Sequence, residues 1–126
     1  MSTLLYYRLF SQRLILLLSI IEFLLPNQGN EEFRGTWVIT WDHIDKNKNA
    51  VQNINHLQQI IDHHKSANMN AIIFQVRQSG TTYYNSSYEP WGYYAGYNDP
   101  GYDPLAKAIE LAHEKGIEVH AWFNVF

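Results

Sequence analysis

The sequence contains no cysteine, so it can form neither disulfide bonds nor thiolate metal sites, and it gives no indication of the redox compartment. It also lacks an excess of positive charge: the formal net charge of the 126-residue chain is −3, which argues against a broad basic surface for nucleic acid. Nothing in it matches a glycine-rich phosphate loop, a serine nucleophile elbow or a metal-binding motif. We therefore expect no cofactor, no metal and no nucleic acid partner, in a chain long enough for one small domain.

Residues 1–30 differ in composition from the rest of the chain. Arg8 and Arg13 precede the apolar run Leu14–Ile21. A positive flank followed by about 8–12 apolar residues is typical of a secretory signal peptide, whereas a membrane span needs roughly 20. Because Glu22 interrupts the apolar stretch and no clear cleavage site follows, an uncleaved N-terminal anchor is the alternative. We expect an exported protein, periplasmic, extracellular or anchored to the envelope, whose membrane association depends on this segment.

The segment Ala71–Arg77 predicts the central strand. Alternate residues from Ile72 to Val76 form a face that is apolar throughout, whereas the opposite face becomes polar at Gln75 and Arg77. A strand that is covered on one side and carries polar groups only at its C-terminal end on the other is typical of a parallel α/β barrel. We therefore expect a site at that end.

The flanking segments predict a β-α-β-α-β order. The expected elements are a strand over Arg34–Asp42, a helix from about Ile54 to Lys65 with Asn53 as its N-cap, the strand Ala71–Arg77, a helix from Pro104 to about Lys115, and a strand over Ile117–Phe126. In the first strand, the mixed face from Thr36 to Asp42 is expected to point away from the helices. Three such strands make only part of a barrel, so residues 31–126 are interpreted as the N-terminal portion of a larger parallel α/β barrel. A complete flavodoxin-like domain, the alternative, needs more strands.

A long aromatic loop follows the central strand, from Gln78 to Tyr102. It contains Trp91 and seven tyrosines, at positions 83, 84, 88, 93, 94, 97 and 102. Loops of this length are usually functional or disordered, and this one is too aromatic for ordinary disorder. Since sugar C–H faces pack on aromatic rings with polar tips, Trp91 is predicted to form a stacking platform. Most of the tyrosines are expected to form the packing core of the loop itself.

Polar residues near the strand ends are the candidate site residues. Gln75 and Arg77 can hydrogen-bond sugar hydroxyls or an acidic substituent. His120 and Asn124 share one face of the last strand and are candidates for the same ligand. Asp42, at the end of the first strand, could orient a substrate, pair with Arg77 or be a solvated carboxylate. The alternative for Arg77 is a structural ion pair, and for His120 a buried histidine with satisfied hydrogen bonds.

Five motifs follow one another along residues 33–126. They are Phe33–Val38, Phe74–Arg77, Glu89–Trp91, Asp99–Leu105 and Glu118–Asn124. On these motifs the chain resembles the N-terminal part of the glycosyl-hydrolase-like family 10 domain of bacterial envelope and secreted proteins. The resemblance implies a (β/α)8 TIM-type barrel, incomplete in this chain, and glycosidase activity on a polysaccharide such as the cell-wall glycan. The acidic cluster that this family carries near its fourth strand would lie beyond Phe126.

Glycoside hydrolysis typically uses two carboxylates that flank the scissile bond. We therefore expect a glycoside hydrolase-like protein of which this chain supplies part of the substrate site but not the catalytic acids, so that the chain alone is inactive. A non-catalytic carbohydrate-binding or envelope scaffold protein is the alternative. Acidic residues at the ends of the strands that follow Phe126 would discriminate between the two. The sugar, the linkage and the stereochemistry depend on carboxylates that this sequence does not contain.

Overall fold

The computed structural model describes residues 32–126, so the expected signal peptide or anchor over residues 1–30 lies outside the described residues. The described part alternates strands and helices along the chain, in agreement with the expected α/β class. Its elements are β1 (Gly35–Val38), α2 (Thr40–His43), α3 (Ala50–Ser66), β2 (Ala71–Gln78), β3 (Thr81–Thr82), the 3-10 helix η1 (Tyr93–Ala95), α4 (Pro104–Glu114) and β4 (Glu118–Phe123). Among these, no helix is both long and apolar enough to span a bilayer.

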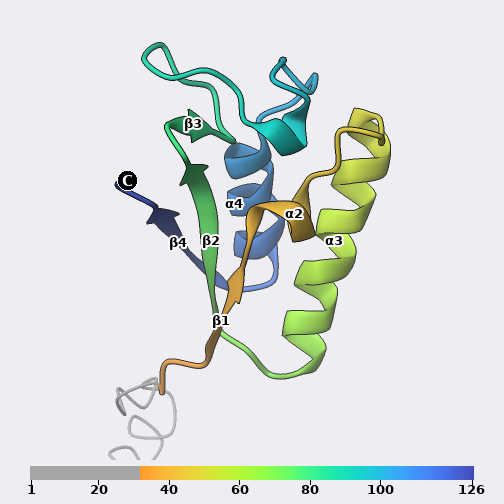
Figure 1. The fold of residues 1–126 in the computed structure, drawn as a ribbon. Coiled ribbons are helices and arrows are strands. Elements are labelled where there is room, and N and C mark those ends of the chain that lie inside the picture. The colour runs from red at the N-terminus through yellow and green to blue at the C-terminus, as the bar shows by residue number, and fades with distance from the viewer. Residues whose placement is uncertain (1–31) are drawn as a thin grey trace, which may run out of the picture. The chain divides into compact units, whose positions relative to one another are not determined.

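β2 is the central strand of the sheet (Figure 1). β1 pairs with it in parallel, with Gly35 opposite Ala71 and Val38 opposite Phe74. β4 pairs with the same stretch of β2, also in parallel, and therefore lies along its other edge. The two-residue strand β3 turns back on the end of β2 as an antiparallel hairpin. The expected central position of the segment Ala71–Arg77 is thus confirmed.

The hydrophobic core lies between the sheet and the two long helices, α3 and α4, which pack against one face (Figure 1). The predicted alternation in β2 is confirmed, because Ile72, Phe74 and Val76 are all fully buried in this core. Burial of apolar side chains on this one face is the main force that holds helices and strands together. The core residues are Val38, Leu57, Ile61, Ile72, Phe74, Val76, Ala108, Leu111, Ala112 and Ile117.

Helix α4 begins and ends as expected. The carboxylate of Asp103 accepts a hydrogen bond from the backbone amide of Ala106 at 2.9 Å, and Pro104 takes the first helical position, where no amide is needed. At the other end, Gly116 has φ = +67°, a left-handed conformation that glycine adopts without strain and that ends the helix.

Helix α3 begins earlier than predicted. Asn49, not Asn53, is the N-cap, and it forms a capping box in which the side chains of Asn49 and Gln52 bond reciprocally to backbone amides. Asn53 is instead a buried residue in the first turns of the helix. Its side-chain oxygen accepts from the amide of Asp45 at 3.0 Å, and its side-chain nitrogen donates to the carbonyls of Asp45 and Lys48. Asn53 therefore fixes the loop that precedes the helix.

The first strand is shorter than predicted, and this part of the prediction was wrong. β1 ends at Val38, and Thr40–His43 forms the short helix α2, so Asp42 is helical and exposed. Side chains from β2 account for the change of direction. The amide of Thr40 donates to Oε1 of Gln75 at 3.1 Å, and its hydroxyl donates to Oε1 of Gln78 at 2.9 Å. These tertiary bonds outweigh the β propensity of the segment.

The two faces of β1 are also the reverse of the prediction. Val38 is buried against the helices, and the hydroxyl of Thr36 donates to Nε2 of His64 on α3, whose Nδ1 donates to the carbonyl of Ile60. Trp37 points to the opposite face, where it is 63% exposed. Polar residues can occupy the covered face because α3 itself presents a polar partner there.

β4 ends at Phe123, not at Phe126, and it carries an irregularity near its end. Trp122 lies opposite Gln75, but the next residue, Phe123, lies opposite Arg77. One residue of β2 is therefore left unpaired, and the alternation of faces is shifted from this point. The predicted strand over Ile117–Phe126 was therefore too long.

Candidate functional site

A groove opens beyond the C-terminal end of β2, between the β2–β3 hairpin and the later part of the aromatic loop around η1. It has a volume of about 370 Å³. The hairpin contributes an amide and two hydroxyl groups, and the loop contributes tyrosines. The lining residues are Gln78, Ser79, Thr81, Tyr83, Tyr93, Tyr94 and Tyr97. The groove thus lies where the sequence predicted a site, at the carboxyl end of the parallel strands.

Tyr93, Tyr94 and Tyr97 form one side of this groove, and we call these three residues the tyrosine wall. The ring of Tyr93 makes edge-to-face contacts with Tyr94, at 5.2 Å between centroids, and with Tyr97, at 5.9 Å. Trp41 of α2 contacts Tyr94 at 5.9 Å from the other side. Tyr97 is 64% exposed, so the wall presents ring surface to solvent. Such rings combine an apolar face with a polar hydroxyl.

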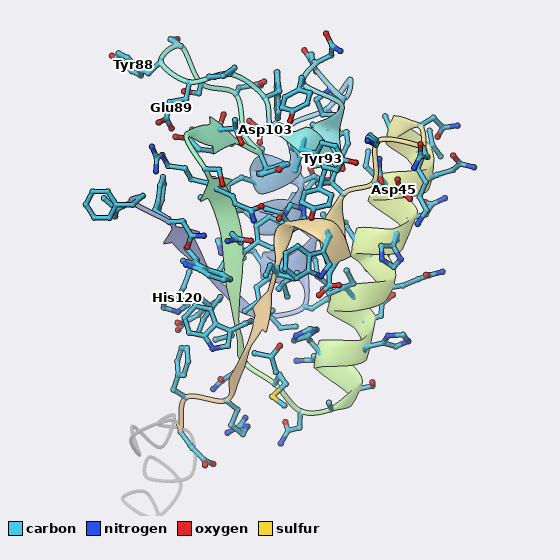
Figure 2. The ribbon with its side chains drawn as sticks, viewed as in Figure 1. Asp45, Tyr88, Glu89, Tyr93, Asp103 and His120 are labelled. Atoms are coloured by element: carbon cyan, nitrogen blue, oxygen red, sulfur yellow. The ribbon has the colours of Figure 1, made fainter. Side chains whose placement is uncertain are left out.

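A positive charge borders the wall. Nζ of Lys46 lies 3.7 Å from the centroid of the Tyr93 ring, within the range of a cation–π interaction. Figure 2 shows Tyr93 on the side of the aromatic loop nearest the loop that carries Asp45, whereas Tyr88 and Glu89 lie at the opposite side. The wall is therefore supported by the segment that Asn53 fixes.

Tyr83 forms the floor of the groove and explains a glycine in the loop. Its side chain is fully buried. A Cβ atom at Gly92 would clash with the Tyr83 ring and hydroxyl and with Oγ1 of Thr81, so only glycine fits at this close approach. Burial raises the pKa of Tyr83, against the opposing effect of its hydrogen bonds. Its hydroxyl therefore stays protonated at neutral pH.

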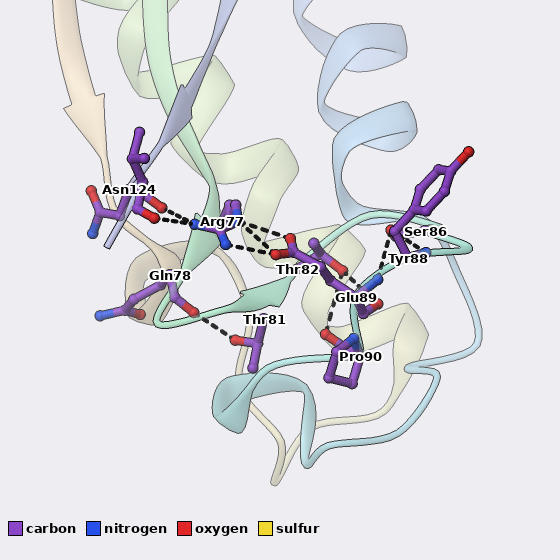
Figure 3. Close-up of polar contacts among 10 residues, drawn as sticks. Arg77, Gln78, Thr81, Thr82, Ser86, Tyr88, Glu89, Pro90 and Asn124 are labelled. Atoms are coloured by element: carbon purple, nitrogen blue, oxygen red, sulfur yellow. Dashed lines mark hydrogen bonds and ion pairs between the residues drawn. The ribbon is translucent and has the colours of Figure 1, made fainter.

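Arg77 forms a forked ion pair with Glu89 of the aromatic loop (Figure 3). Nε of Arg77 lies 3.0 and 2.8 Å from the two carboxylate oxygens of Glu89, and Nη2 lies 2.6 Å from Oε1. Nη1 donates to the carbonyls of Asn124 and, at 3.2 Å, Val125. The hydrogen bond to Arg77 lowers the pKa of Glu89 and raises that of Arg77, so both groups stay charged. The expected alternative of a structural ion pair describes this geometry, and the partner is Glu89, not Asp42.

Gln75 is brought to the strand end as predicted, but it is turned inward. Its side chain is 1% exposed, and its Oε1 is held by the amide of Thr40. In this geometry it holds Thr40 of α2 and is not open to a ligand. Its predicted contact with substrate stays a prediction.

Trp91 is half-buried in the packing core of the loop. It packs with Tyr94 against a second cluster of buried residues, Ile44, Tyr83 and Ala95. Its backbone also forms an isolated bridge with Thr82. The ring surface that lines the groove belongs to Tyr83 and to the tyrosine wall, and the stacking role predicted for Trp91 stays a prediction.

His120 and Asn124 do not meet at one point. His120 lies within β4, opposite Ile73, where its Nε2 donates to Glu118 at 3.0 Å and its ring contacts Phe33. Figure 2 shows it far along the sheet from the labelled Tyr93. Asn124 follows β4 directly, and its amide donates to the carbonyl of Arg77 at 3.2 Å. Asn124 thus lies beside Arg77, whereas His120 is exposed and not the buried histidine of the alternative.

Asp42 lies in a different groove, beside α3. This second groove has a volume of about 320 Å³. It is lined by Trp37, Val38, Asp42, His56, Ile60, His63 and His64. Of the six predicted site residues, only Arg77 and Asn124 are therefore brought together.

Several residues of the groove were not singled out in the sequence. Gln78, Thr81 and the tyrosine wall had no motif that separated them from their neighbours, although the excess of tyrosine pointed to the loop as a whole. Glu89 lies outside this lining, and its pairing with Arg77 could have been predicted, because a carboxylate twelve residues after Arg77, in a loop returning to the strand, is a natural ion-pair partner. Over residues 32–126, no cluster of three or more potential ligands suits a metal ion.

The chain matches known proteins along most of its length. It is 34% identical over 113 residues to Glycosyl hydrolase YngK of Bacillus subtilis (strain 168), which covers 84% of this chain and 22% of that protein. It is 33% identical over 114 residues to Glycosyl hydrolase DigH of Escherichia coli (strain K12), which covers 79% of this chain and 26% of that protein. The chain thus spans about a quarter of the length of these curated relatives.

The family match covers the strands, the groove and the aromatic loop alike. It extends over residues 32–126 and is to the family described as Glycosyl hydrolase-like 10. The resemblance that the five motifs indicated is thereby confirmed: the chain belongs to the Glycosyl hydrolase-like 10 family.

Proposed function

We propose that the groove beyond β2 binds a polysaccharide, with the cell-wall glycan as the candidate, and supplies part of the substrate site of a glycosyl hydrolase-like protein. The observation that carries this proposal is the lining of the groove, in which tyrosine rings stand beside Gln78, Ser79 and Thr81. Sugars present C–H faces that pack on aromatic rings and hydroxyls that bond to amides and other hydroxyls.

The catalytic acids are proposed to come from parts of the whole protein that this chain does not span. Within residues 32–126, two carboxylates of the aromatic loop region are already engaged. Glu89 is held by Arg77, and Asp103 accepts from the amides of Asn85 and Ala106. A hydrolase needs a proton donor and a base or nucleophile that can reach the scissile bond.

A non-catalytic carbohydrate-binding or scaffold protein is the second candidate. It is favoured by the described lining of the groove, which contains tyrosines, an amide and hydroxyls but no carboxylate. The two candidates differ in a reducing-end assay on the whole protein. A hydrolase releases new reducing ends from a polysaccharide, whereas a scaffold protein binds the same glycan and leaves it intact.

The described part is proposed to be the first section of a (β/α)8 barrel. Three parallel strands follow one another across the sheet in chain order, and both connecting helices, α3 and α4, lie on one face. The other face carries Trp37 and Trp122, whose rings contact each other at 4.9 Å. In a closed barrel this face would become the interior.

Export is proposed for residues 1–30. Alkaline phosphatase, which is active only outside the cytoplasm, is expected to be active when fused after Asn30, because Arg8 and Arg13 precede an apolar run. A matched fusion with Leu17→Arg, which interrupts that run, is expected to be inactive. An inactive enzyme in the first fusion would contradict the proposal.

Tyr97→Ala is expected to weaken glycan binding by roughly two- to tenfold, the range for loss of one aromatic stacking contact. Tyr97 is chosen because it lines the groove and is largely exposed. The measurement is a titration of the 126-residue chain with tetrasaccharides of β-1,4-linked glucose, β-1,4-linked N-acetylglucosamine and α-1,4-linked glucose.

Tyr88→Ala is the matched control for this experiment. Tyr88 is 95% exposed at the tip of the same loop, outside the groove (Figure 2). It is expected to leave both binding and melting temperature unchanged. Equal weakening by the two substitutions, or no binding of any tetrasaccharide by the unsubstituted chain, would argue against a glycan site in this groove.

A further inference from the structure

The guanidinium of Arg77 connects three segments that are distant in the sequence. Arg77 is the next-to-last residue of β2, Glu89 belongs to the aromatic loop, and the carbonyls of Asn124 and Val125 follow β4 (Figure 3). We call Arg77, Glu89 and these two carbonyls the clasp. The forked geometry distinguishes the pair from a single exposed ion pair, since two parallel bonds fix orientation as well as distance.

Arg77 has almost no hydrogen-bonding capacity left for a ligand. A guanidinium has five N–H groups: one on Nε and two on each terminal nitrogen. Nε faces the two oxygens of Glu89, Nη1 donates to both carbonyls of the clasp, and Nη2 donates once to Glu89. One N–H of Nη2 remains. The hydrogen bonds of Arg77 therefore connect parts of the protein to one another and leave little for a ligand.

A series of backbone hydrogen bonds connects the segment after Glu89 to the groove. The residue after it, Pro90, accepts from the amide of Thr82 at 2.9 Å, and the carbonyl of Thr82 accepts from the amide of Gly92 at 3.1 Å. Gly92 then precedes η1, which begins at Tyr93 of the tyrosine wall. A shift of Glu89 would thus move the segment from which the wall starts.

We propose that Arg77 and Glu89 are positioning residues: their clasp sets the tyrosine wall against the strand ends and couples it to the segment after β4. The part of this inference that concerns glycan binding rests on the proposed function. Arg77 thereby acts on binding through the loop and not by contact with the sugar.

Hydrogen exchange tests the clasp without any ligand. In the full 126-residue chain, amides of residues 82–92 are expected to exchange about tenfold faster in Glu89→Gln and in Arg77→Ala, whereas those of α3 and α4 keep their rates. The double substitution is expected to exchange no faster than either single one, because both remove the same clasp. Arg77→Lys, which keeps the charge but cannot fork, is expected to restore little of the protection.

Three results would overturn the clasp: unchanged exchange in residues 82–92, faster exchange throughout the chain, or full protection in Arg77→Lys. Binding of the tetrasaccharide probes is then compared in the same variants. Weaker binding in proportion to loop exchange supports the positioning role, and unchanged binding despite a loosened loop overturns it. If the unsubstituted chain binds no probe while the loop loosens as expected, the proposed function fails and the clasp stands.

Discussion

Ile72→Ala is expected to lower the free energy of unfolding by about 2–5 kcal/mol, the range for large-to-small substitutions in a well-packed core. Ile72 is fully buried in the central strand, between Thr36 of β1 and Val119 of β4, and belongs to the core beneath α3 and α4. Strands that are paired on both edges can collapse little around a cavity. The loss is measured as a lower midpoint of urea unfolding with an unchanged m-value.

Ile109→Ala is the matched control, since it removes the same atoms at a position of α4 that is 37% exposed. It is expected to change the free energy of unfolding by well under half the effect of Ile72→Ala, because alanine also favours the helix. Binding of tetrasaccharides per folded molecule is expected to be unchanged in both variants. Similar losses of stability at the two positions would mean that the core does not lie where the structure has it.

The parts of the fold that local patterns determine were predictable. The alternation from Ile72 to Val76 marks one buried face, and Asp103-Pro104 marks a helix start by two independent local preferences. Both signals depend on residues that are neighbours in the sequence. Their structural consequences, a central strand and the start of α4, are present as expected.

The short helix α2 could not be predicted in the same way. Residues 36–42 have strong β propensity, but the chain turns at Thr40, where Gln75 and Gln78 bond to it from another strand. Those partners lie 35 and 38 residues away in the sequence. The same long-range effect moved Asp42 out of the expected site and into the groove beside α3.

The place of the groove was predictable from the sequence, but its lining residues were not. Parallel strands bring their carboxyl ends to one edge, so a groove near Arg77 and the aromatic loop could be expected from the sequence. Which side chains point into a groove depends on tertiary bonds. Arg77 is ion-paired with Glu89, and Gln75 is hydrogen-bonded to Thr40. The tyrosine wall lines the groove instead.

His43 is a buried ionisable residue that the sequence analysis did not single out. It is fully buried on α2, with its ring 4.1 Å from that of Phe74 and 6.0 Å from that of Tyr83. Its Nε2 donates to the carbonyl of Gln75 at 3.0 Å, while Nδ1 has no hydrogen-bond partner. Burial lowers the pKa of His43 from 6.5 to about 4, although the bond to Gln75 opposes this shift.

The contribution of His43 to the free energy of unfolding is therefore expected to fall by roughly 3 kcal/mol between neutral pH and about pH 4. In this window the unfolded chain binds a proton at His43 and the folded chain does not, so each unit of acidification favours unfolding by up to about 1.4 kcal/mol. The stabilising contribution is complete above pH 6.5 and is lost as the pH falls towards about 4. Urea unfolding at a series of pH values from 7.5 to 4.5 measures the slope.

His43→Gln isolates this contribution. The glutamine amide is long enough to donate to the carbonyl of Gln75 in place of Nε2, but it does not titrate. All other ionisable groups are common to both proteins and cancel in the difference between their unfolding free energies. That difference is expected to favour the unsubstituted chain at neutral pH and to shrink as the pH falls. Parallel curves over the whole range would mean that His43 is not held neutral in the folded chain, and that α2 does not seal it from water.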